Sequence, residues 1–163
     1  MIQFLAENDV ILQYLAILVL QVAALRWGDL PERLCAALLV AMVIWEILYH
    51  YVFMANFVVT DVDFGHFAMS LGAEFGYLAI ALYANRVYPL WLASLQLISV
   101  LTHIARKLDE GVTGFAYQLI VIAPSYFMIL IIAVGIIQHQ RRLKRYGPYR
   151  AWRRGQSAEN LQQ

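Results

Sequence analysis

Residues 10–33 read VILQYLAILVLQVAALRWGDLPER, an apolar run that ends in a short polar connection. Residues 10–25 carry no charge, and the run approaches the roughly 20 residues that a helix needs to cross a bilayer. The connection contains Gly28, Asp29 and Pro31, which are residue types typical of turns. This stretch therefore predicts a transmembrane helix followed by a tight turn.

The same alternation of apolar run and polar break continues along the chain. Four further apolar runs cover residues 34–59, 66–84, 90–104 and 112–138. We therefore expect an all-α integral membrane protein, a bundle of five transmembrane helices. The run at 90–104 is the shortest, so the alternative is four transmembrane helices with a re-entrant segment at 90–104.

The composition also indicates a chain embedded in lipid. Hydrophobic residues make up 62% of the sequence and charged residues 14%, whereas a soluble domain has about 25% charged residues. The single cysteine, Cys35, excludes an internal disulfide and is expected to pack as a small apolar residue. We expect one polytopic transmembrane domain over residues 1–140, followed by a basic juxtamembrane segment and a disordered tail over residues 141–163.

The distribution of basic residues predicts the orientation of this bundle. With the C-terminus in the cytoplasm, ten of the twelve Lys and Arg residues fall on the cytoplasmic side, and only Arg106 and Lys107 fall outside. The positive-inside rule expects this asymmetry, so the N-terminus is predicted outside. The first residues are acidic where a signal peptide would be basic, so we expect no removed signal peptide. The small size and short connections are typical of a protein of the bacterial inner (cytoplasmic) membrane.

Polar residues recur along one face of three of the expected helices. Residues three or four apart share a helix face, and ionisable groups within a membrane segment usually face protein or water. The run at 34–59 places Glu46, His50 and Met54 at a spacing of four. The runs at 66–84 and 90–104 carry their own stripes, which are His66, Ser70, Glu74 and Tyr77, and Gln96, Ser99, His103 and Arg106.

The predicted orientation brings these stripes together in the outer half of the membrane. His50 and His103 would lie about one helical turn below the outer surface, and Glu46 and Glu74 about two turns below it. We hypothesise that these four residues form a pathway for ions or protons, because Glu and His side chains can bind and release protons. A chain of this size would line such a pathway as a homo-oligomer or as a subunit of a larger membrane complex.

A second interpretation of the same residues is a membrane-embedded transition-metal site with a transport or catalytic role. Imidazole and carboxylate groups are ligands for zinc and iron, and Met54 or Met69 would favour copper. Haem held by His50 and His103 is a further alternative. The candidate metal ligands are His50, His66, His103, Glu46, Glu74 and Asp63.

A third interpretation is structural. The polar side chains would then satisfy one another, or pair with a partner chain, in a structural or assembly subunit of a membrane complex. Ser70 and Ser99 share stripes with His66 and His103, but this spacing is too common to predict a catalytic nucleophile. The sequence therefore leaves open whether the protein is an enzyme.

The segment near the C-terminus mixes basic and aromatic residues. Seven of the twelve Lys and Arg residues lie within residues 141–154. A basic segment next to a membrane helix is typical of contact with anionic lipid headgroups. We predict such contact here, and no binding of nucleic acid. The residues expected to bind lipid are Arg141, Arg142, Lys144, Arg145 and Trp152.

Overall fold

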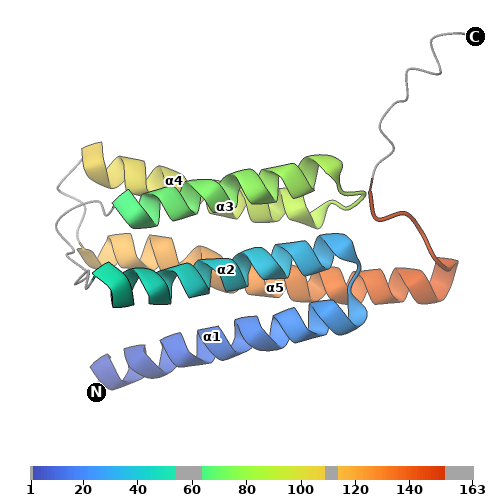
Figure 1. Ribbon diagram of the computed structural model, residues 1–163, viewed down its shortest axis with the longest axis horizontal. Helices are drawn as coiled ribbons and strands as arrows, with labels where there is room; N and C mark the ends of the chain where they lie inside the picture. The colour runs from blue at the N-terminus through green and yellow to red at the C-terminus, as the bar shows by residue number, and fades with distance from the viewer. Residues whose placement is uncertain (1, 54–63, 109–113, 153–163) are drawn as a thin grey trace, which may run out of the picture.

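The computed structural model describes residues 2–53, 64–108 and 114–152, with side chains for residues 10–49, 51, 64–105 and 123–152. Over these ranges the chain forms five helices that run back and forth along one axis (Figure 1). The helices are α1 (Ile2–Trp27), α2 (Leu30–Phe53), α3 (Phe64–Tyr83), α4 (Tyr88–Leu108) and α5 (Gly114–Tyr146). The predicted all-α class and the number of helices are confirmed.

The start of α2 is fixed by a local pattern of hydrogen bonds. Glu32 Oε2 accepts a hydrogen bond from the Asp29 amide at 3.0 Å, and Asp29 Oδ1 accepts one from the Leu30 amide at 2.8 Å. The Asp29 carbonyl also accepts a hydrogen bond from the Arg33 amide at 3.0 Å. This arrangement resembles a capping box, in which the residue at the third helical position reaches back to the cap. The cap explains why α2 begins at Leu30, before the apolar run that predicted it.

Among the described residues, three helices are long and apolar enough to cross a membrane. The spans that meet this description are Val10–Trp27 of α1, Tyr88–Ala105 of α4 and Ala123–Tyr146 of α5. The sequence identified the α4 region as the shortest run, but α4 is one continuous helix of 21 residues. Its length does not favour the re-entrant alternative.

The helices pack as an up-and-down bundle with α1 at one edge. α3 packs against α4, and α4 packs in turn against α5, while α1 contacts α2 and α5 (Figure 1). The α1–α2 and α3–α4 connections and the C-terminal end of α5 lie at the same end of the bundle. We call this the basic end, and the other the opposite end.

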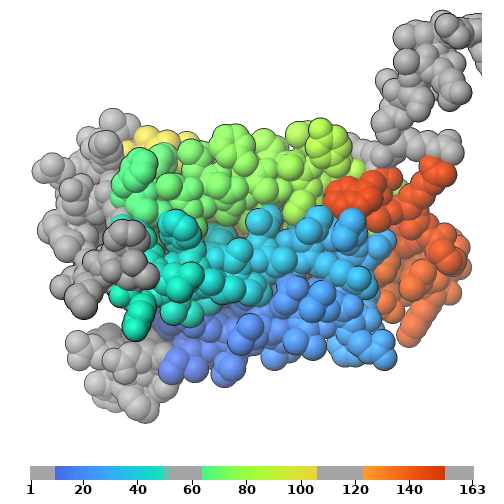
Figure 2. Space-filling model, in the orientation of Figure 1, coloured from blue at the N-terminus to red at the C-terminus, as the bar shows by residue number. Residues whose placement is uncertain are grey.

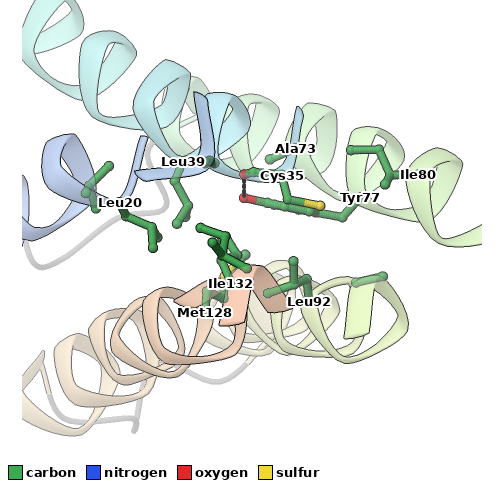
Figure 3. Close-up of a cluster of buried hydrophobic side chains, with 14 of the residues drawn as sticks. Leu20, Cys35, Leu39, Ala73, Tyr77, Ile80, Leu92, Met128 and Ile132 are labelled. Atoms are coloured by element: carbon green, nitrogen blue, oxygen red, sulfur yellow. Dashed lines mark hydrogen bonds between the residues drawn. The ribbon is translucent and has the colours of Figure 1, made fainter. Parts of the chain in front are cut away.

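Apolar side chains from all five helices meet in the middle of the bundle (Figure 3). Tyr77 of α3 is fully buried there, and its hydroxyl donates a hydrogen bond to the Cys35 carbonyl at 3.3 Å. Cys35 is buried and packs as a small core residue, as predicted. Leu92 of α4 and Ile132 of α5 are fully buried in the same core. The centre of the bundle is therefore closed by tightly packed apolar groups.

The outward faces of the helices are also apolar. Large hydrophobic side chains are exposed on every helix, and examples are Val19, Ile47, Leu82, Leu101 and Leu130. An apolar surface of this extent is unusual for a soluble monomer.

The chain turns back after α5. Gly147 follows the helix with a φ of 76°, in the left-handed region that favours glycine, and its amide donates to the Leu143 carbonyl. Residues 147–152 then return to the α3–α4 connection, where the red C-terminal segment covers part of the basic end (Figure 2). The helix therefore ends at Tyr146, directly before Gly147.

Candidate functional site

A carboxylate and an imidazole meet between α2 and α3 toward the opposite end of the bundle. Glu46 Oε2 lies 2.9 Å from His66 Nε2, and the two side chains are 31% and 14% exposed. His66 lies near the start of α3 and Glu46 in the second half of α2, so the antiparallel helices place them side by side. The sequence singled out both residues but did not predict their direct contact.

The ring of Tyr49 covers one side of this pair. Its centroid lies 5.1 Å from the His66 ring centroid, with the two rings edge to face. Gly65 leaves room for this ring, because a Cβ at Gly65 would overlap the Tyr49 side chain. Trp45 stacks on the Tyr49 ring at a centroid distance of 6.3 Å. The aromatic rings thus shield His66 while Glu46 stays partly exposed.

A second polar contact lies one helical turn further along α3. His103 Nε2 of α4 lies 3.3 Å from Ser70 Oγ, and both side chains are buried. Gln96 donates from Nε2 to the Ser70 carbonyl at 3.1 Å, which ties α4 to the same turn of α3. The Phe67 ring contacts the His103 ring edge to face at 6.3 Å. The predicted stripes of α3 and α4 do face each other.

Glu74 lies one turn further again along α3, but it takes part in neither contact. Its Oε2 atom is buried and has no hydrogen-bond partner among the described side chains. The structure therefore brings the predicted residues together as two pairs, Glu46 with His66 and His103 with Ser70. Glu74 is placed on the same stripe as His66, as expected from its spacing.

The metal and haem interpretations depend partly on residues whose side chains lie outside the described part of the structure. His50 lies on α2 without a described side chain, while Met54 and Asp63 lie outside the described residues. Where side chains are described, no three His, Cys, Asp or Glu residues lie close enough together to hold a metal ion. Metal and haem binding therefore stay predictions.

A second polar network, which the sequence reasoning missed, lies at the basic end. Arg86, in the α3–α4 connection, donates from Nε to Glu32 Oε1 at 3.2 Å, and its Nη2 lies 3.6 Å from Asp29 Oδ2. Glu32 is fully buried and the Arg86 side chain is 7% exposed. A buried charge is tolerated when it is paired and hydrogen-bonded. This network therefore joins the α1–α2 connection to the α3–α4 connection.

The same network reaches α5 and the C-terminal segment. Arg86 Nη2 lies 3.3 Å from His139 Nδ1, and that nitrogen lies 2.9 Å from the Tyr149 hydroxyl. The guanidinium carbons of Arg86 and Arg142 lie 4.3 Å and 4.2 Å from the centroid of the Tyr149 ring, within cation–π range. Burial raises the pKa of Tyr149, and the opposing effect of Arg86 is smaller.

Backbone contacts hold the returning segment in place. The Asn85 amide donates to the Ala151 carbonyl at 2.9 Å, and Ala84 pairs with Trp152 in an isolated antiparallel bridge. Trp152 is partly buried against the apolar core, so its ring is engaged within the protein. The other predicted lipid-binding residues are exposed on α5, namely Arg141, Arg142, Lys144 and Arg145.

One signal in the sequence pointed to this second network. Asp29 and Glu32 lie in one connection and Arg86 in another, and the basic-residue distribution already placed both connections on the same side of the membrane. Opposite charges on neighbouring connections are natural partners where water is scarce. His139 gave a weaker signal, because a histidine close to several arginines is expected to lie at the membrane surface and not in a buried network.

In comparisons with known proteins, no family model, no curated protein sequence and no solved structure matches the chain.

Proposed function

We propose that the protein crosses the membrane five times, with its N-terminus outside and its basic end in the cytoplasm of a bacterial cell. α2 and α3 contain 24 and 20 residues, which correspond to about 36 Å and 30 Å at 1.5 Å per residue. These lengths suit a hydrocarbon layer of about 30 Å. The exposed apolar faces support the membrane location, and the seven basic residues within 141–154 support the orientation.

The function that we propose for this bundle is the movement of protons or cations, with Glu46 and His66 as the pair that binds and releases the proton. The observation that carries this proposal is the 2.9 Å approach of Glu46 Oε2 to His66 Nε2. A carboxylate and an imidazole at this distance can hold one proton between them. Partial exposure of Glu46 gives the proton a way to leave.

Ser70 and His103 extend this pair toward the middle of the bundle. A hydroxyl and an imidazole can each donate and accept a hydrogen bond, as the members of a proton relay must. Gln96 and Phe67 position these two groups. Glu74 adds a carboxyl group on the same helix, with one buried oxygen for which the described part of the chain supplies no hydrogen-bond partner.

The apolar core limits how far a single chain can carry a proton. Tyr77, Leu92 and Ile132 are fully buried between the Glu46–His66 region and the basic end. We therefore propose that the rest of the pathway is formed between copies of this chain, or with a larger partner in a membrane complex. Such a surface would cover exposed apolar side chains of the helices.

Proton flux into liposomes tests this function. Purified protein is reconstituted with a pH-sensitive dye inside, and a potassium gradient with valinomycin drives proton entry. We expect Glu46→Gln to lower the flux at least tenfold relative to the wild type, because the amide cannot bind the proton. Glu159→Gln makes the same chemical change near the C-terminus and should leave the flux unchanged.

Equal flux for the wild type and Glu46→Gln, in two proteins that are equally folded, would rule out the proposed role of the pair. The same preparations separate the alternatives. Stoichiometric zinc, iron or copper in elemental analysis, or a Soret absorption band, would support the metal or haem interpretation. Flux that appears only with a co-purified protein would support the subunit interpretation.

A further inference from the structure

A polar pocket of about 310 Å³ opens at the basic end, between the α3–α4 connection, α5 and the returning C-terminal segment. Ligand pockets in proteins typically start at about this size. The polar residues that line it are Asn85, Arg86, Tyr88, Gln138, His139, Arg142 and Tyr149. No acidic residue is among the lining residues, so the pocket is suited to an anion.

Arg142 supplies positive charge that no carboxylate of the described residues neutralises. The charge of Arg86 is already offset, because its guanidinium contacts Glu32 and Asp29. Arg142 is exposed on α5 and rests on the Tyr149 ring, and no carboxylate among the described residues lies within ion-pair distance of it. Its donors are therefore available to a bound anion.

His139 contributes a second donor. An arginine can only donate hydrogen bonds, so His139 Nδ1 is the acceptor where it bonds to Arg86 Nη2, which lies 3.3 Å away. The Tyr149 hydroxyl lies 2.9 Å from the same nitrogen. An imidazole whose Nδ1 accepts carries its proton on Nε2. In the tautomer that accepts from Arg86, His139 Nε2 carries the N–H group that can donate to a bound anion.

An apolar groove adjoins the polar pocket. A second cavity, of about 390 Å³, runs between α4 and α5 and is lined by Trp91, Leu130, Ile131 and Val134. The cavities share Val87, Tyr88 and Gln138 in their walls. Gly135 lets α5 lie close to the Tyr88 ring, because a Cβ at Gly135 would lie 3.1 Å from that ring. A site with a charged pocket at one end and an apolar groove at the other is amphipathic.

From this geometry we infer that one anionic glycerophospholipid binds at the basic end, with its phosphate in the polar pocket at Arg142 and His139. One acyl chain would follow the groove between α4 and α5 toward the membrane centre. Charge complementarity favours this occupant, since the α5 surface beside Arg142 carries the exposed Arg141 and Lys144. This site is more specific than the general attraction of a basic tail to a membrane surface, and it does not depend on proton movement.

Native mass spectrometry of the full chain tests the site. Protein is released from nanodiscs that contain equal amounts of phosphatidylglycerol and phosphatidylcholine, and retained lipids are counted. We expect one retained phosphatidylglycerol per chain, and at least a tenfold loss of retention in Arg142→Gln. Arg145→Gln removes the same charge from the same helix outside the pocket and should change retention less than twofold.

The groove is tested separately. Val134→Trp should fill it and reduce retention about tenfold, whereas Ile137→Trp adds the same ring at an exposed position outside the groove and should not. Equal loss in Arg142→Gln and Arg145→Gln would overturn the inference in favour of non-specific charge attraction. Equal retention of phosphatidylcholine would also overturn it. If inorganic phosphate displaced the lipid at equal concentration, the site would belong to a soluble anion instead.

Discussion

The two ends of the bundle use ionisable residues in different ways. At the basic end, Glu32 is fully buried, and Arg86 contacts Glu32, Asp29, His139 and the Tyr149 ring. Toward the opposite end, Glu46 and His66 form a pair in which both groups remain partly exposed. A fully buried and many-partnered ion pair resists a change of charge, whereas a partly exposed pair can gain or lose a proton at lower cost. The buried network at the basic end suits a structural role, and the partly exposed pair suits the exchange of protons.

Removal of Arg86 should have the largest effect on stability. Arg86→Gln leaves the Glu32 carboxylate buried without its cation, and breaking a buried pair in this way costs about 3–5 kcal/mol. Unfolding by a denaturing detergent in mixed micelles, followed by circular dichroism, measures the loss. The control Arg145→Gln changes an exposed arginine and should shift the free energy of unfolding by no more than about 0.5 kcal/mol.

The double variant Glu32→Gln with Arg86→Gln sharpens this test. Two neutral side chains can share a hydrogen bond, so the double variant should be more stable than Arg86→Gln alone. If Arg86→Gln were as stable as Arg145→Gln, the basic end would not be held by this network, and the contrast between the ends would fail.

Alanine substitutions at two glycines test how tightly each end of the bundle is packed. A Cβ at Gly28, at the basic end, would lie 2.6 Å from the Ala24 carbonyl oxygen and 2.8 Å from Glu32 Cβ, so the backbone would have to move. We expect Gly28→Ala to cost about 1–3 kcal/mol. At Gly65 the obstacle is the far part of the Tyr49 ring, which can rotate, so Gly65→Ala should cost only about 0.5–1.5 kcal/mol.

The same detergent unfolding measures both variants. Gly72→Ala is the control, because a Cβ at Gly72 would meet no other atom within 4 Å, and alanine favours a helix by about 1 kcal/mol over glycine. An equal or greater loss for Gly65→Ala than for Gly28→Ala would contradict the tighter packing of the basic end.

The fold was predictable because its signals are local. Each apolar run is contiguous in the sequence, and the break at Gly147 depends only on neighbouring residues. Helix bounds were less accurate. α2 starts earlier than its apolar run because Asp29 and Glu32 cap it with polar groups, which hydropathy counts against a helix.

The contacts of the candidate sites depend on how helices rotate against one another. Spacing placed His66, Ser70 and Glu74 on one face, but it could not tell which of them would meet Glu46 on α2. Arg86 and Glu32 are separated by 54 positions, and their pairing requires two connections to lie side by side. The distribution of basic residues places both connections on the same side of the membrane, but it does not predict that Arg86 and Glu32 pair.

The pH dependence of Tyr149 tests how firmly the returning segment is docked. Burial raises the pKa of Tyr149, so the folded protein holds the phenol proton more tightly than the unfolded chain, whose tyrosines titrate near 10. Its contribution to stability is complete below about pH 10 and is lost as the pH rises through the higher folded value. The difference in absorbance at 295 nm between the wild type and Tyr149→Phe should show a midpoint above 10. A midpoint at or below 10 would mean that the segment is not docked as described.

The smallest effect on stability is expected at the pair that we propose to be functional. Glu46 is partly exposed, and exposed or half-exposed ion pairs contribute about 0–1 kcal/mol. Glu46→Gln should therefore change the free energy of unfolding by less than about 1 kcal/mol while it abolishes most of the proton flux. A loss of several kcal/mol would make this pair a structural element like Glu32 and Arg86. A small loss together with a large fall in flux would separate the two ends by role, because a residue kept for stability cannot be removed at so little cost.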